Sequence, residues 1–590
     1  MDRKGIIAVA LAVITLFAWT IYNQREIEKA TALRRAAAAE QQRKKAAEEP
    51  VPPAPAVSAP APEALPPGEA PVEEKSEKLA SPAVEFTFSN LGGGIASALL
   101  LTHEAERGKR MVINEFGSVP IGAISEVAGE GTRLPFTASR DERAGAVIYE
   151  RTDARQLQIT KRFTLGPAAG FNEDYALKLD VSFTNRGAQP LVLPGYFVHT
   201  GVAAPVHQRD LAIYTGLKAA GGKFIDVNSF SAGGLPLFGH PARPVYTESR
   251  INIEWLGATN QYFTTLISPK VTAPAQDPAG QTRQRGASVW GKRFDIADET
   301  WIASGRSTDG PKGARHGVQG ALGMPGFSLE PGQSVAQSFT IYTGPREYSR
   351  LERLGGTEEQ IMDFGMFGIV SKTLLNVMNW LHARLGSYAA AIIVLTLIIK
   401  TMLWPLQNKA TSSMKRMQLL QPKITELKEK YPDDPTRMNT EMMKLYKDYG
   451  VNPLSGCLPM FIQIPIFFGF YNMLGKAVEL RNSKFLWVQD LSQPDTIWHL
   501  PGLGIPVNVL PLVMAATMFW QMSISPKSGD PMQQRIFMFM PLIFIFFCYN
   551  FASALALYWA VQNLFSVAQL YVTRNQAPPQ LQKAAPAKRK

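Results

Sequence analysis

Residues 388–403 read YAAAIIVLTLIIKTML, an almost wholly apolar run that contains one charged side chain, Lys400. Together with its flanks, this run is long enough to cross a bilayer as a helix. A charge at the centre of such a helix costs roughly 2.5–3.5 kcal/mol on insertion scales. We therefore expect the lysine to reach water, to have a polar partner or to serve a function.

Two explanations of Lys400 stay open from the residues alone. The lysine precedes Trp404 by four residues, which is about 6 Å along a helix at ~1.5 Å per residue, so its ammonium is close enough to snorkel to the membrane surface. The alternative is a fixed positive charge inside a groove, where it attracts a negatively charged segment.

The apolar run is one of several along the chain. Five blocks of membrane length occupy approximately residues 386–404, 456–476, 506–523, 536–551 and 554–572. A further apolar run, residues 5–22, follows two basic residues. We interpret it as an uncleaved signal anchor rather than a cleaved signal peptide, because it is long and no small-x-small site follows. The sequence thus predicts six spans.

Basic residues predict the orientation of these spans. The loop 405–455 carries nine Lys and Arg residues, the loop 477–505 carries two, and the tail after Tyr571 carries five. The positive-inside rule therefore places 405–455, both termini and the tail in the cytoplasm, and the region after the first span outside. Four basic residues in 23–42 against two before the first span argue the other way, but long domains translocate largely regardless of charge.

The loop 405–455 is helical by composition on both sides of Tyr431-Pro432-Asp433-Asp434-Pro435, which predicts a helical hairpin. Its Met-rich apolar face suits either packing between the two helices or adaptable contact with partners.

The region between the first two spans has a different pattern. Residues 24–82 are predicted to form a tether, in which the Ala- and charge-rich stretch 24–49 forms a fraying helix and the Pro/Ala-rich stretch 50–82 is extended. From residue 83 to about 350, apolar and polar residues alternate, as in Tyr175–Thr184. This alternation predicts a large antiparallel β-sandwich domain. Residues 357–385 then show helical spacing typical of an amphipathic helix at the membrane surface.

Polar side chains recur at helical spacing within the spans, so each set shares one helix face. They are Thr396 and Lys400; Thr517 and Gln521; and Gln562, Ser566 and Gln569, with Gln463 and Asn472 in the second of the five blocks. Ordinary hydrogen bonding between helices explains any one pair. Several stripes together with a charge favour a shared hydrated cavity.

Several function classes find no support in the residues. The histidines lack metal-ligand spacing, and no GxSxG, HExxH, GxGxxG or Walker pattern occurs. Cys457 and Cys548 lie in or beside apolar blocks and are interpreted as inert thiols. The net charge of +12 is concentrated beside apolar blocks, which indicates membrane orientation rather than nucleic-acid binding. We therefore expect no enzyme, no cofactor and no metal.

The segment Leu419–Asn472 contains LLQPKITELKEKY and EMMKLYKDYGVNPLSGCLPMFIQIPIFFGFYNML. It closely resembles the YidC/Oxa/Alb family of membrane protein insertases. Further matches are VELR at 478–481, FLW at 485–487, DPMQQ at 530–534 and LYW at 557–559, so the resemblance covers about 370–573. The long alternating domain is similar to the Gram-negative form of that family.

The resemblance implies a fold with several parts. It implies a signal-anchor span at 1–23, a tether at 24–82, a periplasmic β-supersandwich at 83–350, an interfacial helix at 357–385, a five-span core at 386–573 with its hairpin at 405–455, and a basic cytoplasmic tail at 574–590. It also implies a multi-pass protein of the bacterial inner membrane with both termini in the cytoplasm.

The resemblance further implies an insertase and chaperone for nascent membrane proteins, acting alone or with the Sec translocon. One basic residue in a hydrophilic groove, usually Arg in a T-x-x-x-R pattern, would attract substrate; Thr396, Lys400 and Trp404-Pro405 occupy that pattern here with Lys for Arg. The implied groove residues are Lys400, Thr396, Gln463, Thr517, Gln521, Tyr558, Trp559, Gln562 and Ser566. The implied partners are nascent chains, the Sec translocon, lipids, the ribosome and the signal recognition particle receptor, with no nucleic acid as substrate.

Two other functions stay open. A transporter or channel that uses Lys400 is expected to pair it with acidic groups in the spans, and no Asp or Glu lies well inside the last five blocks. A membrane-anchored carbohydrate enzyme would place its active site in the β domain.

Overall fold

The computed structural model describes residues 73–106, 108–166, 173–208, 210–231, 242–270, 285–306, 315–451, 458–499, 506–525, 540–542 and 544–574. Every described residue belongs to one compact unit, which lies within Ala70–Lys590. The expected signal anchor, the tether up to residue 72, Cys457 and residues 575–590 of the tail lie outside the described residues.

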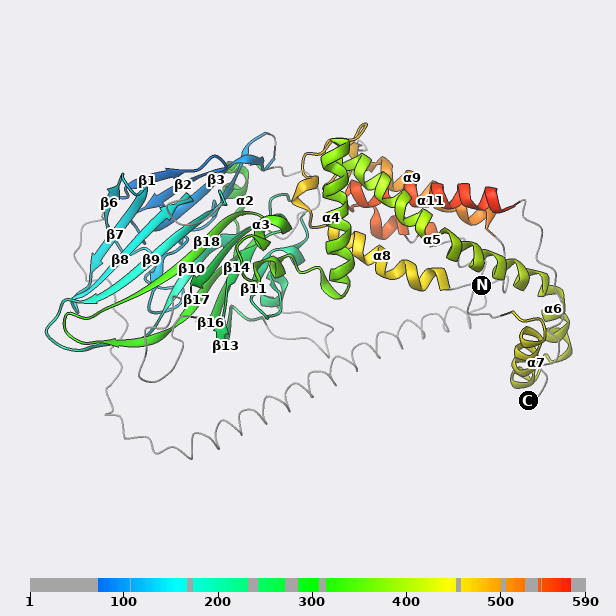
Figure 1. The fold of residues 1–590 in the computed structure, drawn as a ribbon, viewed down its shortest axis with the longest axis horizontal. Helices are drawn as coiled ribbons and strands as arrows, with labels where there is room; N and C mark the ends of the chain where they lie inside the picture. The colour runs from blue at the N-terminus through cyan, green and yellow to red at the C-terminus, as the bar shows by residue number, and fades with distance from the viewer. Residues whose placement is uncertain are drawn as a thin grey trace, which may run out of the picture. The chain divides into compact units, whose positions relative to one another are not determined.

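The first part of the described chain is a β domain in which all paired strands are antiparallel (Figure 1). Its four-stranded sheet consists, in order, of β1 (Ser76–Ala80), β2 (Val84–Ser89), β3 (Gly94–Glu104) and β4 (Arg110–Ile113). Its five-stranded sheet consists of β13 (Val245–Ile253), β16 (Gly286–Asp295), β17 (His316–Leu329), β10 (Leu191–Ala203) and β5 (Ile124–Ser125).

The largest sheet of the β domain has nine strands. In order they are β12 (Ile225–Asp226), β11 (Gly216–Ala219), β14 (Leu256–Thr259), β15 (Phe263–Lys270), β18 (Ser334–Pro345), β9 (Ala176–Asn185), β8 (Leu157–Leu165), β7 (Ala146–Thr152) and β6 (Thr137–Asp141). Two short helices, α2 (Asp298–Ala303) and α3 (Tyr348–Glu352), complete the domain.

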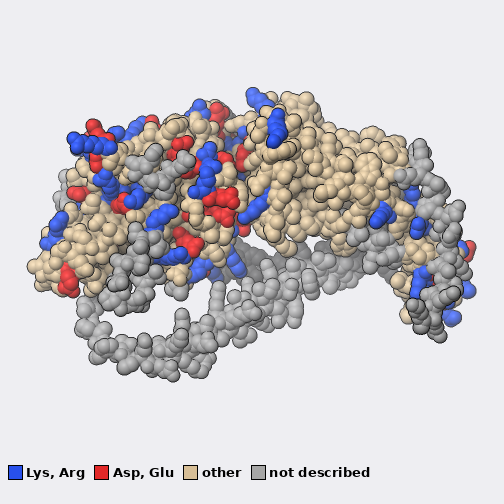
Figure 2. Space-filling view, in the orientation of Figure 1, with Lys and Arg blue, Asp and Glu red and all other residues tan. Residues whose placement is uncertain are grey.

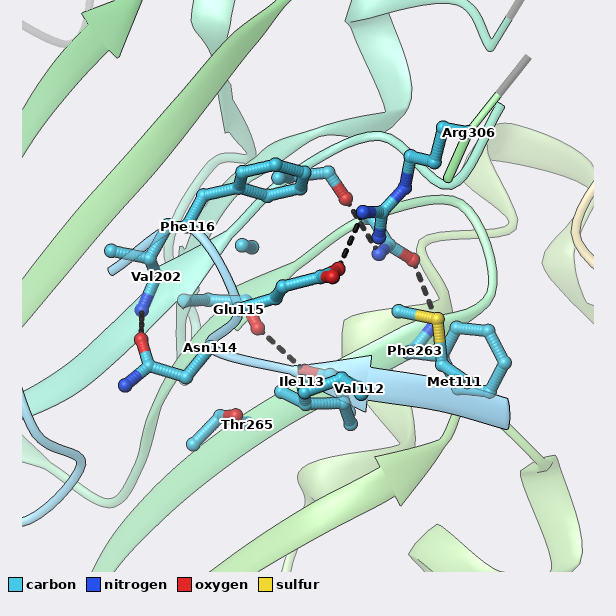
Figure 3. Close-up of a pocket in the computed structure, with 15 residues that line it drawn as sticks. Met111, Val112, Ile113, Asn114, Glu115, Phe116, Val202, Phe263, Thr265 and Arg306 are labelled. Atoms are coloured by element: carbon cyan, nitrogen blue, oxygen red, sulfur yellow. Dashed lines mark hydrogen bonds and ion pairs between the residues drawn. The ribbon is translucent and has the colours of Figure 1, made fainter. Parts of the chain in front are cut away.

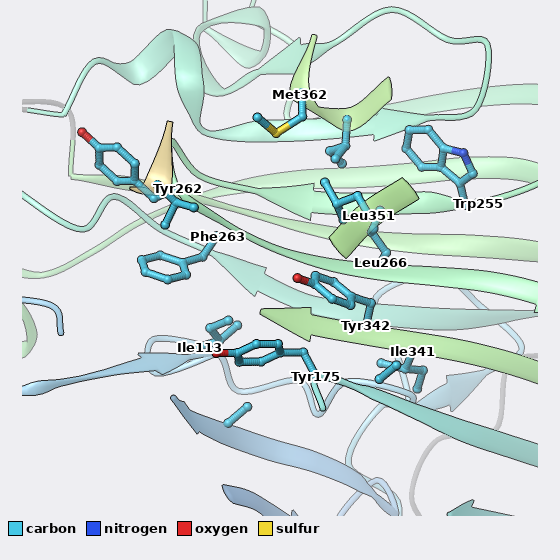
Figure 4. Close-up of a cluster of buried hydrophobic side chains, with 14 of the residues drawn as sticks. Ile113, Tyr175, Trp255, Tyr262, Phe263, Leu266, Ile341, Tyr342, Leu351 and Met362 are labelled. Carbon is cyan, nitrogen blue, oxygen red and sulfur yellow. The ribbon is translucent and has the colours of Figure 1, made fainter. Parts of the chain in front are cut away.

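The predicted alternation is confirmed in β9. Leu177, Leu179, Val181 and Phe183 are buried, whereas the residues between them are half-buried. Side chains of period two point to one face of a sheet, so this face forms the core. Figure 4 shows the aromatic part of that core, where Tyr175 and Tyr342 lie edge to face.

The β domain begins earlier than the sequence predicts. Ser76–Ala80, placed in the tether by composition, form strand β1 and pair with β2. Leu79 is buried opposite Phe86. A short, mostly polar segment has little propensity of its own to form a strand. Strand β1 can therefore be recognised only from its pairing with β2.

Helices make up most of the rest of the described chain. They are α4 (Gly368–Leu385), α5 (Tyr388–Leu419), α6 (Gln421–Lys430), α7 (Pro435–Asp448), α8 (Leu458–Leu474), α9 (Val509–Ile524) and α11 (Ser553–Arg574). A short hairpin of two strands lies between α8 and α9. The residues before α4 form 3₁₀ turns, η4 (Glu358–Met362) and η5 (Gly365–Phe367), so the regular helix expected over 357–385 starts only at Gly368.

Among the described residues, α5 is long and apolar enough to cross a membrane, and Phe461–Leu474 and Val509–Ile524 are shorter apolar helices. The prediction of six spans is therefore not established by the described part of the chain. The face of the molecule in Figure 2 agrees with a membrane region, because charged side chains are frequent over the β domain, sparse over the helices next to it, and frequent again near α6 and α7.

The hairpin differs from the prediction at its start. Pro405 lies inside α5, which continues without interruption from the apolar run to Leu419. Proline is tolerated in membrane helices because neighbouring groups satisfy the freed carbonyl. The chain bends at Leu420, just before a proline in the first turn of α6. Two of the hairpin's Met-rich face residues, Met417 and Met442, pack against its small core, whereas Met443 is exposed.

A buried carboxylate joins α4 to the loop after α8. Glu479 lies in η7 (Val478–Leu480), and its Oε1 accepts a hydrogen bond of 3.4 Å from Nδ2 of Asn379 on α4. Its Oε2 is buried without a hydrogen-bond partner in the described chain. Burial raises the pKa of Glu479 from 4.5 to about 7.

This shift predicts that stability falls as pH rises from 4.5 to 7. The folded protein holds the Glu479 proton more tightly than the unfolded chain does, so the folded state loses about 3 kcal/mol across this window, at ~1.36 kcal/mol per pKa unit. E479Q should remove this part of the pH dependence and be more stable than the parent at pH 8, as measured by thermal unfolding in detergent. The same pH slope in both proteins would contradict the prediction.

Candidate functional site

A row of polar side chains runs along α11 where this helix faces α5 and α8. We define the polar row as Tyr558, Gln562, Ser566 and Gln569 of α11 together with their partners Gln463, Lys400 and Asn408. The α11 members are spaced by four, four and three residues, which places them on one face of the helix. The row therefore follows the helix axis over three turns.

At one end of the row, Gln463 of α8 links two residues of α11. Its Nε2 donates to the hydroxyl of Tyr558 at 3.1 Å and to Oε1 of Gln562 at 3.0 Å. The ring of Tyr558 is buried and stacks on Phe470, with centroids 4.0 Å apart. The amide is thus held between a buried ring and a second amide.

The lysine lies at the centre of the row. Nζ of Lys400 donates to Oγ of Ser566 at 3.0 Å, and that hydroxyl donates onward to the carbonyl oxygen of Gln562 at 2.9 Å. The side chain of Lys400 is half-buried. In this structure the ammonium thus points toward α11. Within the described ranges no carboxylate pairs with it, so its positive charge is not neutralised there.

At the other end, Nε2 of Gln569 donates to Oδ1 of Asn408 at 3.1 Å, and Nζ of Lys415 donates to the carbonyl oxygen of Thr573 at 2.9 Å. Asn408 is a member that our sequence prediction missed. Its position, two helical turns after Lys400, was the available signal, but a single amide near a basic loop does not stand out.

Three residues predicted for the groove are not members of the polar row. Thr396 is buried, and its hydroxyl donates to the carbonyl oxygen of Ile392 in its own helix at 2.7 Å. Thr517 of α9 accepts a hydrogen bond of 3.2 Å from Nδ2 of Asn563 on another face of α11. Trp559 packs against Phe467 and Phe544. Threonine in a helix readily bonds its own backbone, so its spacing alone does not indicate a polar cavity.

Gln521, on α9, lies one turn after Thr517 and is half-buried. In the described part of the chain its side chain makes no hydrogen bond with the polar row, whose members come from α5, α8 and α11. The structure thus brings Lys400, Gln463, Tyr558, Gln562 and Ser566 together.

The β domain contains a small cavity between strands and Arg306, which follows α2 (Figure 3). Its volume is about 20 Å³, room for roughly one water molecule. Arg306, which lines it, is buried, pairs with Glu115 and lies over the rings of Phe116 and Trp301. The polar groups of this cavity are engaged with one another, and it is too small for a sugar.

Comparisons with known proteins match both parts of the described chain. The family model described as "60Kd inner membrane protein" matches residues 380–580, and that described as "YidC periplasmic domain" matches residues 78–377. The first range contains the helices of the polar row, and the second contains the β domain except the first two residues of β1.

Curated relatives extend the match to most of the chain. "Membrane protein insertase YidC" of Pelobacter propionicus is 31% identical over 501 residues, which cover 82% of this chain and 84% of the relative. The protein of the same name from Geobacter metallireducens is 28% identical and covers 96% of this chain and 97% of the relative.

A solved structure titled "Active YidC insertase crystal structure with the first transmembrane domain resolved" matches 86% of this chain and 93% of its own, at 18% identity and a TM-score of 0.34. Two family models and the relative at 31% identity together decide the assignment. The chain belongs to the YidC family of membrane protein insertases.

Proposed function

We propose that this protein moves nascent membrane proteins from the cytoplasm into the lipid bilayer through a hydrophilic groove along the polar row. The observation that carries the proposal is the unneutralised ammonium of Lys400, which lies among the polar side chains of the row and donates to Ser566. No covalent chemistry is required, because the task is to lower the barrier to crossing.

The physical basis is the cost of moving polar groups into hydrocarbon. A polar group transferred without a hydrogen-bond partner loses several kcal/mol. The amides of Gln463 and Gln562 and the hydroxyl of Ser566 would exchange hydrogen bonds with the polar flank of a substrate. Lys400 would attract acidic flanks, and burial of the apolar segment in lipid would drive the movement.

The same proposal assigns locations to the hairpin, the tail and the β domain, and names the protein partners. The hairpin α6–α7 and the tail would face the cytoplasm, where basic residues are favoured, and the β domain would lie in the periplasm of the bacterial inner membrane. Both termini would then be cytoplasmic. The Sec translocon, the ribosome and the signal recognition particle receptor are the proposed protein partners, with the substrate chain and lipids in the groove.

Crosslinking tests the path directly. A photoreactive residue at Gln562, in the polar row, should crosslink to a stalled nascent membrane protein much more strongly than one at Leu564. Both positions lie on α11, but the side chain of Leu564 is exposed on a different face of the helix. Ribosome-bound chains that contain one apolar segment supply the substrate, and the adducts are separated by electrophoresis.

One outcome of the same experiment would refute the proposed path along the polar row. If the two positions crosslink equally, or only Leu564 does, the substrate does not follow the polar row. Photoreactive residues at positions 517 and 521 would then test whether the substrate passes along α9 instead.

A further inference from the structure

The loop between α8 and α9 presents apolar side chains on its surface. Leu486 is 74% exposed, Ile497 and Trp498 are each 56% exposed, and Trp487 is 39% exposed. We call these four residues the loop platform. Exposed apolar groups that lie together on a folded surface indicate a contact surface.

The first pair, Leu486 and Trp487, lies on a strained backbone turn. Phe485 and Val488 exchange backbone hydrogen bonds of 2.9 and 2.7 Å, so Leu486 and Trp487 form the two-residue tip of a tight turn. Leu486 has φ of +51°, a conformation that favours Gly or Asn. A leucine kept at a strained and exposed position is better explained by what it contacts outside the protein than by the fold.

Asp495 ties the first pair of the platform to α9. Its Oδ2 accepts hydrogen bonds from Nε1 of Trp487 at 3.0 Å and from the backbone N–H of Leu510 at 2.6 Å. Leu510 lies in the first turn of α9. The indole of Trp487 is therefore held at the end of that helix.

A short hairpin carries the second pair, Ile497 and Trp498. Strand β19 (Thr496–His499) pairs with β20 (Pro506–Asn508), so that Trp498 lies opposite Val507, two residues before α9 begins. Asn508 is fully buried, and its Nδ2 donates to the carbonyl oxygen of Tyr549 at 2.7 Å. The platform is therefore attached both to the start of α9 and to the backbone at Tyr549.

The length of α9 places this attachment near the lipid. Its 16 residues span about 24 Å at ~1.5 Å per residue, less than the ~30 Å of a hydrocarbon core. Groups that flank a short span are drawn toward the interface. Tryptophan is favoured at that level because its ring is apolar and its N–H is polar.

We infer that the loop platform inserts into the interfacial layer of the membrane leaflet on the β-domain side, as an anchor additional to the helices. The inference rests on the proposed function only in that α9 is taken to cross the bilayer. The occupant is a lipid surface rather than a protein, because the four platform residues are all apolar or aromatic and the platform is bonded directly to the first turn of an apolar helix.

Nitroxide labels test this placement in the full chain, with Cys457 and Cys548 first replaced. The labels are introduced by I497C and L486C and, on exposed strand β6 of the β domain, by S139C. The protein is reconstituted in vesicles of phosphatidylethanolamine and phosphatidylglycerol. Labels at 486 and 497 should be several-fold more accessible to oxygen, relative to a polar nickel chelate, than the label at 139.

Two outcomes would overturn the inference. Labels at 486 and 497 that are as accessible to nickel as the one at 139 would show that the platform lies in water. Labels shielded from both reagents would show a protein contact instead.

A fourth label, from F519C on an exposed face of α9, separates this inference from the proposed function. Oxygen accessibility at 519 with nickel accessibility at 497 would refute only the platform anchor. Nickel accessibility at both positions would refute the bilayer placement of α9 as well. No substrate is used, so the result does not depend on insertion activity.

Discussion

K400E is expected to reduce insertion of substrates with acidic flanks by more than tenfold, whereas K400R should retain most of it. Two unit charges about 4 Å apart interact by about 4 kcal/mol at an effective dielectric constant of ~20, so reversing the charge turns attraction into repulsion of similar size. Even a third of that energy corresponds to about a tenfold change. Arginine preserves the charge and can still donate to Ser566, although its planar fork differs from an ammonium.

The measurement is insertion in cells depleted of their own insertase, followed by protease accessibility of the substrate. K409E is the matched control, because Lys409 is exposed on the same helix beyond the Lys400–Ser566 contact. It should leave insertion nearly unchanged. Equal insertion by K400E and K400R would remove the charge from the mechanism, and a transporter that uses Lys400 would instead show lysine-dependent ion flux in vesicles.

R346M is expected to destabilise the β domain by about 3–5 kcal/mol, since several buried carbonyls would lose a donor at about 1–3 kcal/mol each. Arg346 is 2% exposed. It donates to the carbonyl oxygens of Asn260 and Ile361 at 2.7 and 2.9 Å and also contacts those of Gln261 and Met362. Burial lowers its pKa to about 10, so the guanidinium stays charged at neutral pH.

R140M provides the comparison for this variant. Arg140 is half exposed and lies 4.0 Å from Glu77, so its loss should cost less than about 1 kcal/mol. Urea unfolding followed by tryptophan fluorescence in detergent compares the two. If both variants unfold at the same urea concentration, the carbonyl contacts of Arg346 do not stabilise the junction between the turn before β15 and η4.

Particular elements show which parts of the fold can be predicted from the local sequence pattern. The alternation in β9 correctly predicted which side chains are buried, because a strand's two faces are set by its own pleat. The apolar run that starts at residue 388 correctly predicted a long helix, although its end at Leu419 did not follow from composition. Strand β1 was missed because its stability comes from pairing with β2 rather than from its residues.

The polar row was only partly predictable. Spacing of three and four residues correctly grouped Gln562, Ser566 and Gln569 on one face of α11. The same rule placed Thr396 beside Lys400, yet its hydroxyl bonds to its own helix. Asn408 was not predicted, because the sequence of one helix does not show which residue of another helix lies opposite it.

The sequence by itself determined the class of this protein: an antiparallel β domain followed by apolar helices, one of which carries a lysine, in a pattern that resembles the insertase family. These properties follow from periodicity and hydropathy, which act over a few neighbouring residues. Only the tertiary structure decided that Lys400 donates to Ser566, that Glu479 lies against α4 and that Asp495 joins the loop platform to α9. Such contacts join residues distant in sequence, and the packing of whole elements selects them.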